Sequence, residues 1–583
     1  MSNNIILTIA PFFHDGEISP SLSLASLAAF LRSKKVMNVR CLDLRLGIEE
    51  NEIYKLHKAN LPGKVLDIRD LPLVAMLLSG KKLEKRLIGI VAKKWGLNAS
   101  RLEADMRHMA EWARAKAPEF SSARLVGLTV FCSNLLYTIA LAKELRSRYP
   151  AAKIVMGGPQ IMLSAVTREI LIEHELADHL VIGEGELPLL KIVNGILGMK
   201  KLPVMLAEMP FPDLDALPVP DFSDFDLTQY PPFQLPYFTS RGCVYGCEFC
   251  SERKLFPGYR KKTVNKIIND LKQLKDRYRA VRISMMDSIL NPTPGRTEEL
   301  ASAILSNKLN IVWGGYLSSK GISRENAKLL KRAGLSFCTL GIESFDATTL
   351  KRMKKASSAS TNFEAISALV ASGIRTNINL IVGYPAQKRD DFDLMCRSMM
   401  DWFLSLGGGA QGFYDIRYFF FQYLPASDAY DIAAKEKGRL LPFSSDSMPG
   451  AISDLKNIKK CNEAFFWNRS YLLESKKMER IVLAMINKLN ITKRNASIDV
   501  RSLAILSRTF RPDDRVRLNP GKPAGKFLKS VNGKASAVGR SLKKWSEIRR
   551  LEAAHGNVRM ILALLAYFRI LSVAAPGAIL KDQ

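Results

Sequence analysis

The sequence has few histidines and no uninterrupted apolar segment long enough to suggest a membrane span. Six of its 583 residues are histidine, and none lies between His179 and His555. A zinc site in a protein usually needs four cysteine or histidine ligands, so the shortage of histidine disfavours zinc in the middle of the chain. The apolar stretch at 560–580 is interrupted by Arg569 and Pro576, which suits a docking helix better than a membrane span.

The N-terminus lacks the features of a secretory signal. Residues 2–4 carry no basic charge, and the apolar run that follows is only about seven residues long. Five of the eight cysteines are scattered along the chain without a C-x-x-C pair, which argues against an iron–sulfur cluster built from these five. They are Cys41, Cys132, Cys338, Cys396 and Cys461. Scattered thiols are typical of a reducing compartment, so we expect the protein in the cytoplasm.

Acidic residues are too few to balance the basic ones. The chain has 86 Lys and Arg against 56 Asp and Glu, a net charge of +30. The excess is densest at 521–550, where nine basic residues accompany only Glu547. This segment is either solvated or attracts an acidic peptide, a phosphorylated metabolite or an anionic membrane surface. Nucleic acid is not expected, because only Phe527 and Trp545 could stack on bases there.

Three cysteines stand close together, at Cys243, Cys247 and Cys250. A C-x-x-x-C-x-x-C loop can bind three irons of a [4Fe-4S] cluster and leave the fourth iron open to a non-protein ligand. The loop follows a strand expected at 236–240 and precedes an amphipathic helix expected at 264–278. Barrels of alternating strands and helices place active-site loops in this position. The open iron predicts chemistry rather than electron storage.

This spacing, with Phe249 before the last cysteine, resembles the signature of the radical S-adenosylmethionine (SAM) enzymes. The resemblance implies that the amino and carboxylate groups of SAM bind the open iron. It also implies that one-electron reduction of the sulfonium produces a 5′-deoxyadenosyl radical. An electron donor such as flavodoxin or ferredoxin is expected. No residue of the sequence identifies the group that acts on the substrate.

Three later segments resemble the same family. Residues 281–287 resemble its second barrel strand, which would place Asp287 at the pocket mouth. Residues 337–344 resemble the Gly-Ile-Glu-Ser segment that lies along SAM, and 379–385 resemble the strand beside the adenine. The resemblance assigns four of these residues to SAM binding: Gly341, Glu343, Ser344 and Gly383.

The first two hundred residues alternate between strands and helices. Strands are expected at 5–10, 39–44, 125–131, 153–159 and 179–186, which predicts a doubly wound parallel sheet with a ligand site at its carboxyl edge. The pattern resembles the cobalamin-binding domain that precedes the barrel in one branch of the family. That resemblance assigns four residues to the cofactor: Gly157, Gly158, Gly183 and Glu184. His14 lies in the loop that carries a cobalt ligand in some members, but its neighbours do not match, so cobalt ligation stays open.

The sequence therefore predicts an α/β protein with four regions. A cobalamin-binding-like domain spans 1–195, with a helical insertion at about 50–120. A proline-rich linker at 196–235 leads to a partial (β/α) radical SAM barrel at 236–430. A basic, mainly helical region occupies 431–583.

The resemblance implies a cobalamin-dependent C-methyltransferase that acts on an unactivated carbon. Its substrate would be a small molecule, a lipid or a peptide, and the basic C-terminal region could contact a membrane surface. One alternative is a radical SAM cyclase, rearrangement enzyme or epimerase that does not use cobalamin for methyl transfer. Another is a cobalamin or iron–sulfur sensor. A methylthiotransferase is disfavoured, because only Cys41 and Cys132 precede the barrel.

Overall fold

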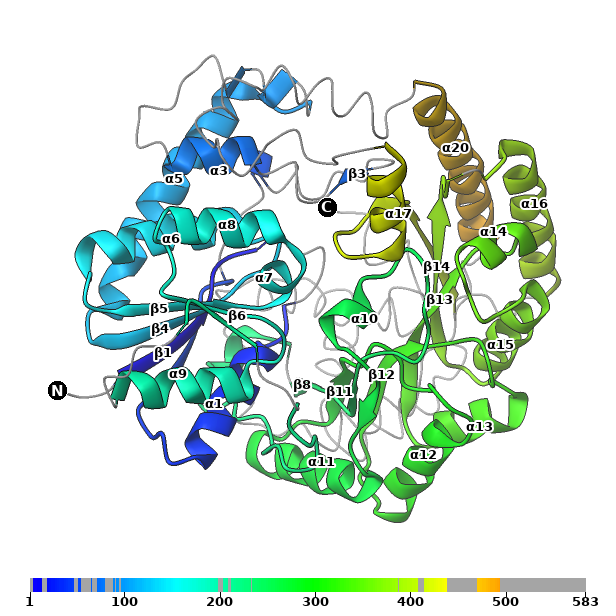
Figure 1. Ribbon diagram of the computed structural model, residues 1–583. Helices are drawn as coiled ribbons and strands as arrows, with labels where there is room; N and C mark the ends of the chain where they lie inside the picture. The colour runs from blue at the N-terminus through cyan, green and yellow to red at the C-terminus, as the bar shows by residue number, and fades with distance from the viewer. Residues whose placement is uncertain are drawn as a thin grey trace, which may run out of the picture. The chain divides into compact units, whose positions relative to one another are not determined.

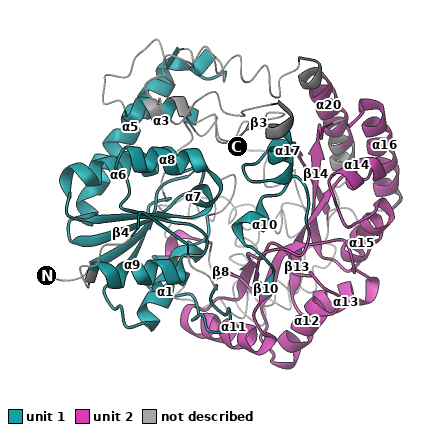
Figure 2. Cartoon of the chain, viewed as in Figure 1, with its two compact units in different colours: residues 1–226, 246–260, 420–472 teal, residues 227–245, 261–419, 473–583 magenta. Residues whose placement is uncertain are grey.

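The computed structural model forms two compact units, which are shown in different colours in Figure 2. The first unit comprises residues 1–226, 246–260 and 420–472, and the second comprises 227–245, 261–419 and 473–583. The structure describes residues 4–12, 18–46, 51–53, 64–65, 71–78, 88–89, 91–93, 96–197, 203–207, 211–231, 233–385, 387–406, 414–437 and 469–492. His14, Cys461 and the predictions for 521–550 and 560–580 lie outside the described residues. Among the described helices, none is both long enough and apolar enough to cross a bilayer.

A six-stranded parallel sheet forms the centre of the first unit (Figure 1). Its strand order is β2-β1-β4-β5-β6-β7. The strands are β1 (Asn4–Ile9), β2 (Val39–Asp43), β4 (Ala123–Thr129), β5 (Lys153–Gly157), β6 (His179–Val181) and β7 (Met205–Leu206). The order reverses between β1 and β4, which is where doubly wound sheets bind ligands at their carboxyl edge. The predicted doubly wound sheet is therefore confirmed.

Helices cover both faces of this sheet. Figure 1 shows α6 and α8 above it and α1 and α9 below it. These helices are α1 (Leu22–Ser33), α6 (Leu135–Arg148), α8 (Ala165–Glu173) and α9 (Glu186–Leu197), and the short α7 (Pro159–Leu163) follows β5. Almost every residue of the first ten in α6 is buried, so this helix must have neighbours on more than one side.

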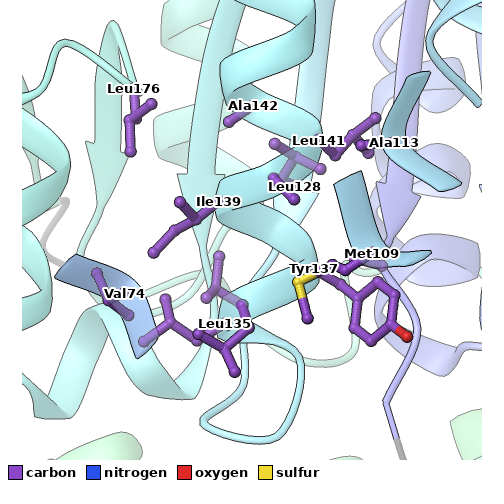
Figure 3. Close-up of a cluster of buried hydrophobic side chains, with 14 of the residues drawn as sticks. Val74, Met109, Ala113, Leu128, Leu135, Tyr137, Ile139, Leu141, Ala142 and Leu176 are labelled. Carbon is purple, nitrogen blue, oxygen red and sulfur yellow. The ribbon is translucent and has the colours of Figure 1, made fainter. Parts of the chain in front are cut away.

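The insertion supplies those neighbours. Its helices α3 (Leu71–Leu78) and α5 (Ala99–Lys116) both contact α6, and Trp112 lies edge-on to Tyr137 with ring centroids 5.2 Å apart. Figure 3 shows part of the shared core, with Val74 of α3, Met109 and Ala113 of α5, and Tyr137 of α6. Helix α5 lies within the helical insertion expected at about 50–120, and its apolar face extends the core of the first unit. The short strands β3 (Lys64–Val65) and β16 (Gln422–Tyr423) pair in parallel.

A second six-stranded sheet forms the centre of the second unit, with its strands in chain order. They are β8 (Gln234–Tyr237), β11 (Arg282–Met285), β12 (Val312–Leu317), β13 (Leu335–Glu343), β14 (Arg375–Val382) and β15 (Tyr414–Phe420). The helices between them are α11 (Val264–Tyr278), α12 (Arg296–Ser306), α13 (Arg324–Arg332), α14 (Ala347–Arg352), α15 (Ala359–Ala371) and α16 (Arg389–Ser405). Figure 1 shows these helices along the outer side of the sheet. This open (β/α) arrangement confirms the predicted partial barrel.

The two faces of the second sheet differ in polarity. On β13, Cys338, Leu340 and Ile342 are fully buried, whereas the alternating Thr339 and Glu343 are only partly buried. Alternate residues of a strand point to opposite faces, so one face packs on the helices and the other forms the inner face. The helices α17 (Asp428–Lys437) and α20 (Arg469–Thr492) are described parts of the C-terminal half.

Candidate functional site

The loop with the three cysteines lies between the short strand β9 (Ser240–Arg241) and the short helix α10 (Glu252–Leu255). All three cysteines are partly exposed. The carbonyl of Cys247 accepts a hydrogen bond from the amide of Cys250 at 3.1 Å, and the amide of Glu252 donates to the Cys250 sulfur at 3.5 Å. A backbone N–H aimed at sulfur favours the thiolate, which is the form that binds metals.

The donor set fits an iron–sulfur cube better than a single metal ion. In the described part of the chain, no three His, Cys, Asp or Glu side chains converge as they would around one ion. Three thiolates on one tetrahedral zinc would lie roughly 4 Å apart, given Zn–S bonds of about 2.3 Å. On a cube each thiolate binds a different iron, so the sulfurs lie further apart. Cys243, Cys247 and Cys250 would hold such a cluster, and their assignment remains a prediction.

Asp287 holds the backbone that leads into this loop. Both of its carboxylate oxygens accept from the amide of Thr239 at 3.0 Å, and Oδ1 also accepts from the hydroxyls of Thr239 (2.7 Å) and Ser240 (2.5 Å). Burial raises the pKa of Asp287, and these hydrogen bonds act in the opposite direction. The residue is only 1% exposed, so its expected place at the pocket mouth is wrong. Its carboxylate instead positions the strand that precedes the cysteines.

A fully buried lysine lies on the other side of the same strand. Lys262 Nζ donates to Tyr237 Oη at 3.1 Å and to Asp270 Oδ2 at 3.2 Å. It also lies 4.3 Å from the ring centroid of Tyr237 and 4.2 Å from that of Phe238. Its backbone amide bonds to the carbonyl of Thr239. Sequence reasoning missed this residue, because a lysine in the run Arg260-Lys261-Lys262 gives no sign of burial.

The burial of Lys262 predicts a pH dependence of stability. Desolvation lowers its pKa from 10.5 to about 8, and Asp270 opposes the shift. Between these two values the unfolded chain binds more protons than the folded one, so this contribution to stability increases as the pH rises. We expect the difference in free energy of unfolding between the wild type and Lys262→Met to shift in favour of the wild type by up to about 3 kcal/mol as the pH rises from about 8 to 10.5. Urea unfolding at about pH 7.5, 9 and 10.5 measures it, with the exposed Lys261→Met as control. Parallel curves for wild type and Lys262→Met would contradict this expectation.

The inner face of the second sheet brings Gly341 and Glu343 together. Glu343 has a left-handed backbone, with φ of 64°, at an irregularity in the pairing of β13 with β14. A Cβ at Gly341 would lie 2.7 Å from Glu343 Oε1, so the carboxylate occupies the space above the glycine. Burial raises the pKa of Glu343, while the Lys355 ammonium 3.8 Å away lowers it. The pair offers an acceptor and a cation to a ligand on this face.

Two asparagines on β14 lie beside this pair. Asn377 is in register with Thr339, and Asn379 with Gly341. The side-chain oxygens of both asparagines are buried and accept no hydrogen bond within the part of the chain that the structure describes. Buried polar atoms are nearly always paired in native proteins, so two orphaned acceptors on one face indicate a polar ligand. SAM, with its amino group and ribose hydroxyls, fits this requirement. Sequence reasoning missed Asn377, and it included Asn379 only as the first residue of the segment that resembles the strand beside the adenine.

Ser344 and Gly383 lie at the ends of the same strands. Ser344 is fully buried, and its hydroxyl donates to Met395 Sδ at 3.3 Å and accepts from the amide of Asp346 at 3.0 Å. The hydroxyl therefore already has partners in the turn after β13. Gly383 follows β14 with φ of 71°. The predicted contacts of Ser344 and Gly383 with SAM stay predictions.

At the carboxyl edge of the first sheet, glycines follow β5 and β6. Gly158 has φ of 105°, and a Cβ there would lie 2.9 Å from the carbonyl oxygen of Val130. Gly183 has φ of 94°, and a Cβ there would meet nothing closer than Phe211 at 3.8 Å. Only glycine tolerates these conformations without strain. At Gly158 the backbone of Val130 fills the place of a side chain, whereas the space beside Gly183 is bounded, among the described residues, by Phe211 alone. Gly157 and Gly158 thus lie where the sequence predicts a cofactor.

Asn134 joins the two strands at the switch point. Its Nδ2 donates to the carbonyls of Thr129 (3.0 Å) and Ala10 (3.4 Å), and its Oδ1 accepts from the amide of Phe131 at 2.8 Å. The side chain is fully buried, so the ends of β1 and β4 are held at a fixed separation. Sequence reasoning missed Asn134, since a polar residue before a helix is usually only a cap.

Glu184 makes an unexpected contact. Its carboxylate forms an ion pair with Arg260, which follows the cysteine loop in the strand β10 (Arg260–Lys261). Arg260 also donates to the carbonyl of Pro212 at 3.2 Å and lies 4.7 Å from the ring centroid of Phe211. The predicted cofactor contact of Glu184 stays a prediction, but its carboxylate already has a cationic partner from the chain itself.

The sequence of the chain is similar to a known protein family and to curated proteins. Residues 237–399 match the model of the radical SAM superfamily. The hopanoid C-3 methylase of Methylococcus capsulatus is 28% identical over 301 residues, which are 46% of this chain and 55% of that protein. The anaerobic magnesium-protoporphyrin IX monomethyl ester cyclase of Rubrivivax gelatinosus is 26% identical over 293 residues, 46% of this chain and 51% of that protein. The chain thus spans about half the length of these curated relatives.

A solved structure shares the fold over almost the whole chain. It is TsrM from Kitasatospora setae, a radical SAM methyltransferase with cobalamin and a [4Fe-4S] cluster bound. The two chains are 14% identical with a TM-score of 0.53, covering 96% of this chain and 100% of that one. The family match covers the cysteine loop and the strands β9, β11, β12, β13 and β14. Through residues 237–399, this chain carries a domain of the radical SAM superfamily.

Proposed function

We propose that this protein is a radical SAM enzyme that holds a [4Fe-4S] cluster on Cys243, Cys247 and Cys250. The observation that supports this most directly is a C-x-x-x-C-x-x-C loop at the start of the matched domain, with no fourth ligand in its spacing. When bound, the cluster supplies the electron that splits the sulfonium of SAM into methionine and a 5′-deoxyadenosyl radical.

The chain's own residues bind and orient SAM for this step. Asp287 fixes Thr239 and Ser240, so the backbone before the cysteines has one conformation. Glu343 and the orphaned oxygens of Asn377 and Asn379 accept hydrogen bonds from the ligand, and Gly341 leaves room for the Glu343 carboxylate that faces it. Holding the reacting groups in one geometry removes much of the entropy cost of the reaction.

The first sheet supports a second cofactor, and we assign cobalamin to it. Its strand order creates a switch point at β1 and β4, and glycines line the neighbouring loops. TsrM, with the same fold, has cobalamin bound, and one relative is named a hopanoid methylase. Cobalamin would supply a transferable methyl group. The proposed reaction is therefore methylation of an unactivated carbon.

The partners follow from the reaction. A radical SAM enzyme needs a reductant, and we assign this role to a flavodoxin or a ferredoxin. The substrate is a small molecule, a lipid or a peptide. The scattered thiols and an oxygen-sensitive cluster favour the cytoplasm.

A second function has one specific observation in its favour. The Rubrivivax gelatinosus relative is named a cyclase rather than a methylase. A cyclase, rearrangement enzyme or epimerase would keep the cluster and SAM but transfer no methyl group. Its products from SAM would include 5′-deoxyadenosine without S-adenosylhomocysteine.

Anaerobic reconstitution tests both functions. The purified chain is loaded with iron, sulfide and hydroxocobalamin, and then given SAM and a reductant. We expect iron–sulfur and corrinoid absorption, with 5′-deoxyadenosine and S-adenosylhomocysteine both detected by mass spectrometry. A reaction without reductant is the control. No corrinoid in the spectrum would remove methyl transfer and leave the radical reaction. No 5′-deoxyadenosine from a protein with a full cluster would remove the radical reaction as well.

A further inference from the structure

The ion pair between Glu184 and Arg260 joins two functional segments of the first unit. Glu184 follows β6, in the loop at the carboxyl edge of the sheet. Arg260 ends the segment 246–260, which includes Cys247 and Cys250 and groups with the first unit (Figure 2). The two residues are 76 positions apart in the chain. A contact over this separation forms only when the segment lies on the sheet edge.

The pair is built as a desolvated contact rather than a surface salt bridge. The Glu184 side chain is only 2% exposed. A carboxylate this deeply buried costs free energy unless a cation and hydrogen bonds compensate it. Arg260 is the cation that compensates it here. An exposed ion pair would contribute little, but removal of one partner here leaves the other buried without its counter-charge.

Two further contacts fix the guanidinium of Arg260. Phe211 lies against one side of it, and the carbonyl of Pro212 accepts one of its N–H groups. Phe211 is also the nearest neighbour of the space above Gly183. Glu184, Phe211 and Arg260 therefore form one layered contact beside Gly183. The Nε of Arg260 is buried and has no acceptor within the described residues, so the other contacts must outweigh this cost.

Two further contacts of the segment are with helices of the first unit. Helix α10, which follows the last cysteine, contacts α7, which follows Gly157 and Gly158. The carbonyl of Glu248 accepts from the amide of Ala429 at 2.9 Å. Neither of these two contacts involves a charge, whereas Glu184 and Arg260 add an ion pair between this segment and the sheet edge.

We propose that Glu184 and Arg260 form a positioning pair, which holds the segment with Cys247 and Cys250 on the carboxyl edge of the first sheet. Glu184 thereby acts through Arg260 and not through direct contact with a cofactor. That this segment carries two cluster ligands rests on the proposed function. Its attachment to the sheet by Glu184 and Arg260 does not depend on that function. The attachment can therefore be tested on protein without any cofactor.

Hydrogen exchange of the full-length, cofactor-free chain tests the pair. We expect Glu184→Gln to speed amide exchange in peptides from 246–260 by at least about tenfold. Alkylation of Cys247 and Cys250, read by mass spectrometry, should accelerate as well. Peptides from α11 should keep their exchange rates. The exposed Glu173→Gln, which removes the same charge elsewhere on the first unit, should change none of these rates.

Two variants of Arg260 separate positioning from general stability. Arg260→Lys keeps the positive charge, but an ammonium cannot stack on Phe211 while it bonds to both Glu184 and the Pro212 carbonyl. Its amide exchange in 246–260 should therefore lie between that of the wild type and that of Glu184→Gln. Glu184→Gln combined with Arg260→Gln removes both charges, and its effect should be smaller than the sum of the single substitutions. This double variant also covers the case in which a single substitution fails to fold. Unchanged exchange in 246–260 for Glu184→Gln, equal acceleration in α11, or additive effects in the double variant would each overturn the proposal.

Discussion

Replacing Cys243, Cys247 and Cys250 together with serine is expected to abolish reductive cleavage of SAM. A serine hydroxyl is a poor ligand for iron at neutral pH, so the variant should not retain the cluster. Loss of a residue that only supports a metal ligand typically costs 10- to 100-fold, and loss of the ligands themselves should exceed about 100-fold. Iron content, the absorption spectrum and 5′-deoxyadenosine formation measure the effect.

Cys41→Ala provides the matched control for this experiment. Cys41 is buried in the first sheet, where its sulfur donates to the carbonyl of Leu24 at 3.4 Å. Burial raises its pKa well above the usual range, so it cannot serve as a ready metal ligand. Iron content and SAM cleavage should stay near the wild-type level in this variant. Wild-type turnover by the triple serine variant would disprove the proposed cluster site.

Asp287→Ala is expected to destabilise the second unit by about 3–5 kcal/mol, because it leaves the Thr239 amide and two hydroxyls without their acceptor. The strand before the cysteines would also lose its fixed conformation, so less iron should bind after reconstitution. Urea unfolding and iron content per chain measure the two effects. Asp287→Asn keeps one acceptor oxygen and should lie between the wild type and the alanine variant.

Asp276→Ala controls for the loss of an acidic residue in the same unit. Asp276 is exposed on α11, so its replacement should change the free energy of unfolding by less than about 0.5 kcal/mol. If Asp287→Ala changed neither stability nor iron content, Asp287 would not be the residue that positions the cysteine loop.

Elements with strong local signals were predicted well from the sequence. The helix expected at 264–278 is α11, which begins after an N-cap at Thr263 and ends at a left-handed Arg279. The doubly wound sheet also follows from the periodicity of apolar residues. Such patterns act over a few neighbouring residues, so the sequence displays them directly. The strand expected at 236–240 is less accurate, because this stretch is divided between β8 and β9, and residues 238 and 239 belong to neither.

Predictions that depended on where a polar side chain points were less reliable. Asp287 follows a strand, as an active-site carboxylate would, but it bonds to a backbone 48 positions away. Lys262, Asn134 and Asn377 were missed entirely. Their burial depends on which strands and helices surround them, and this is not a property of the residues next to them in the chain.

The sequence alone predicts the proposed chemistry of this protein, because the cysteine spacing is set by the few residues of one loop. It also determined the alternation of strands and helices that forms both sheets. Only the tertiary structure decided which polar side chains position the cysteine loop. Glu184 meets Arg260, and Asp287 meets Thr239, only after the chain has folded, since such contacts arise from long-range packing and desolvation and not from local pattern.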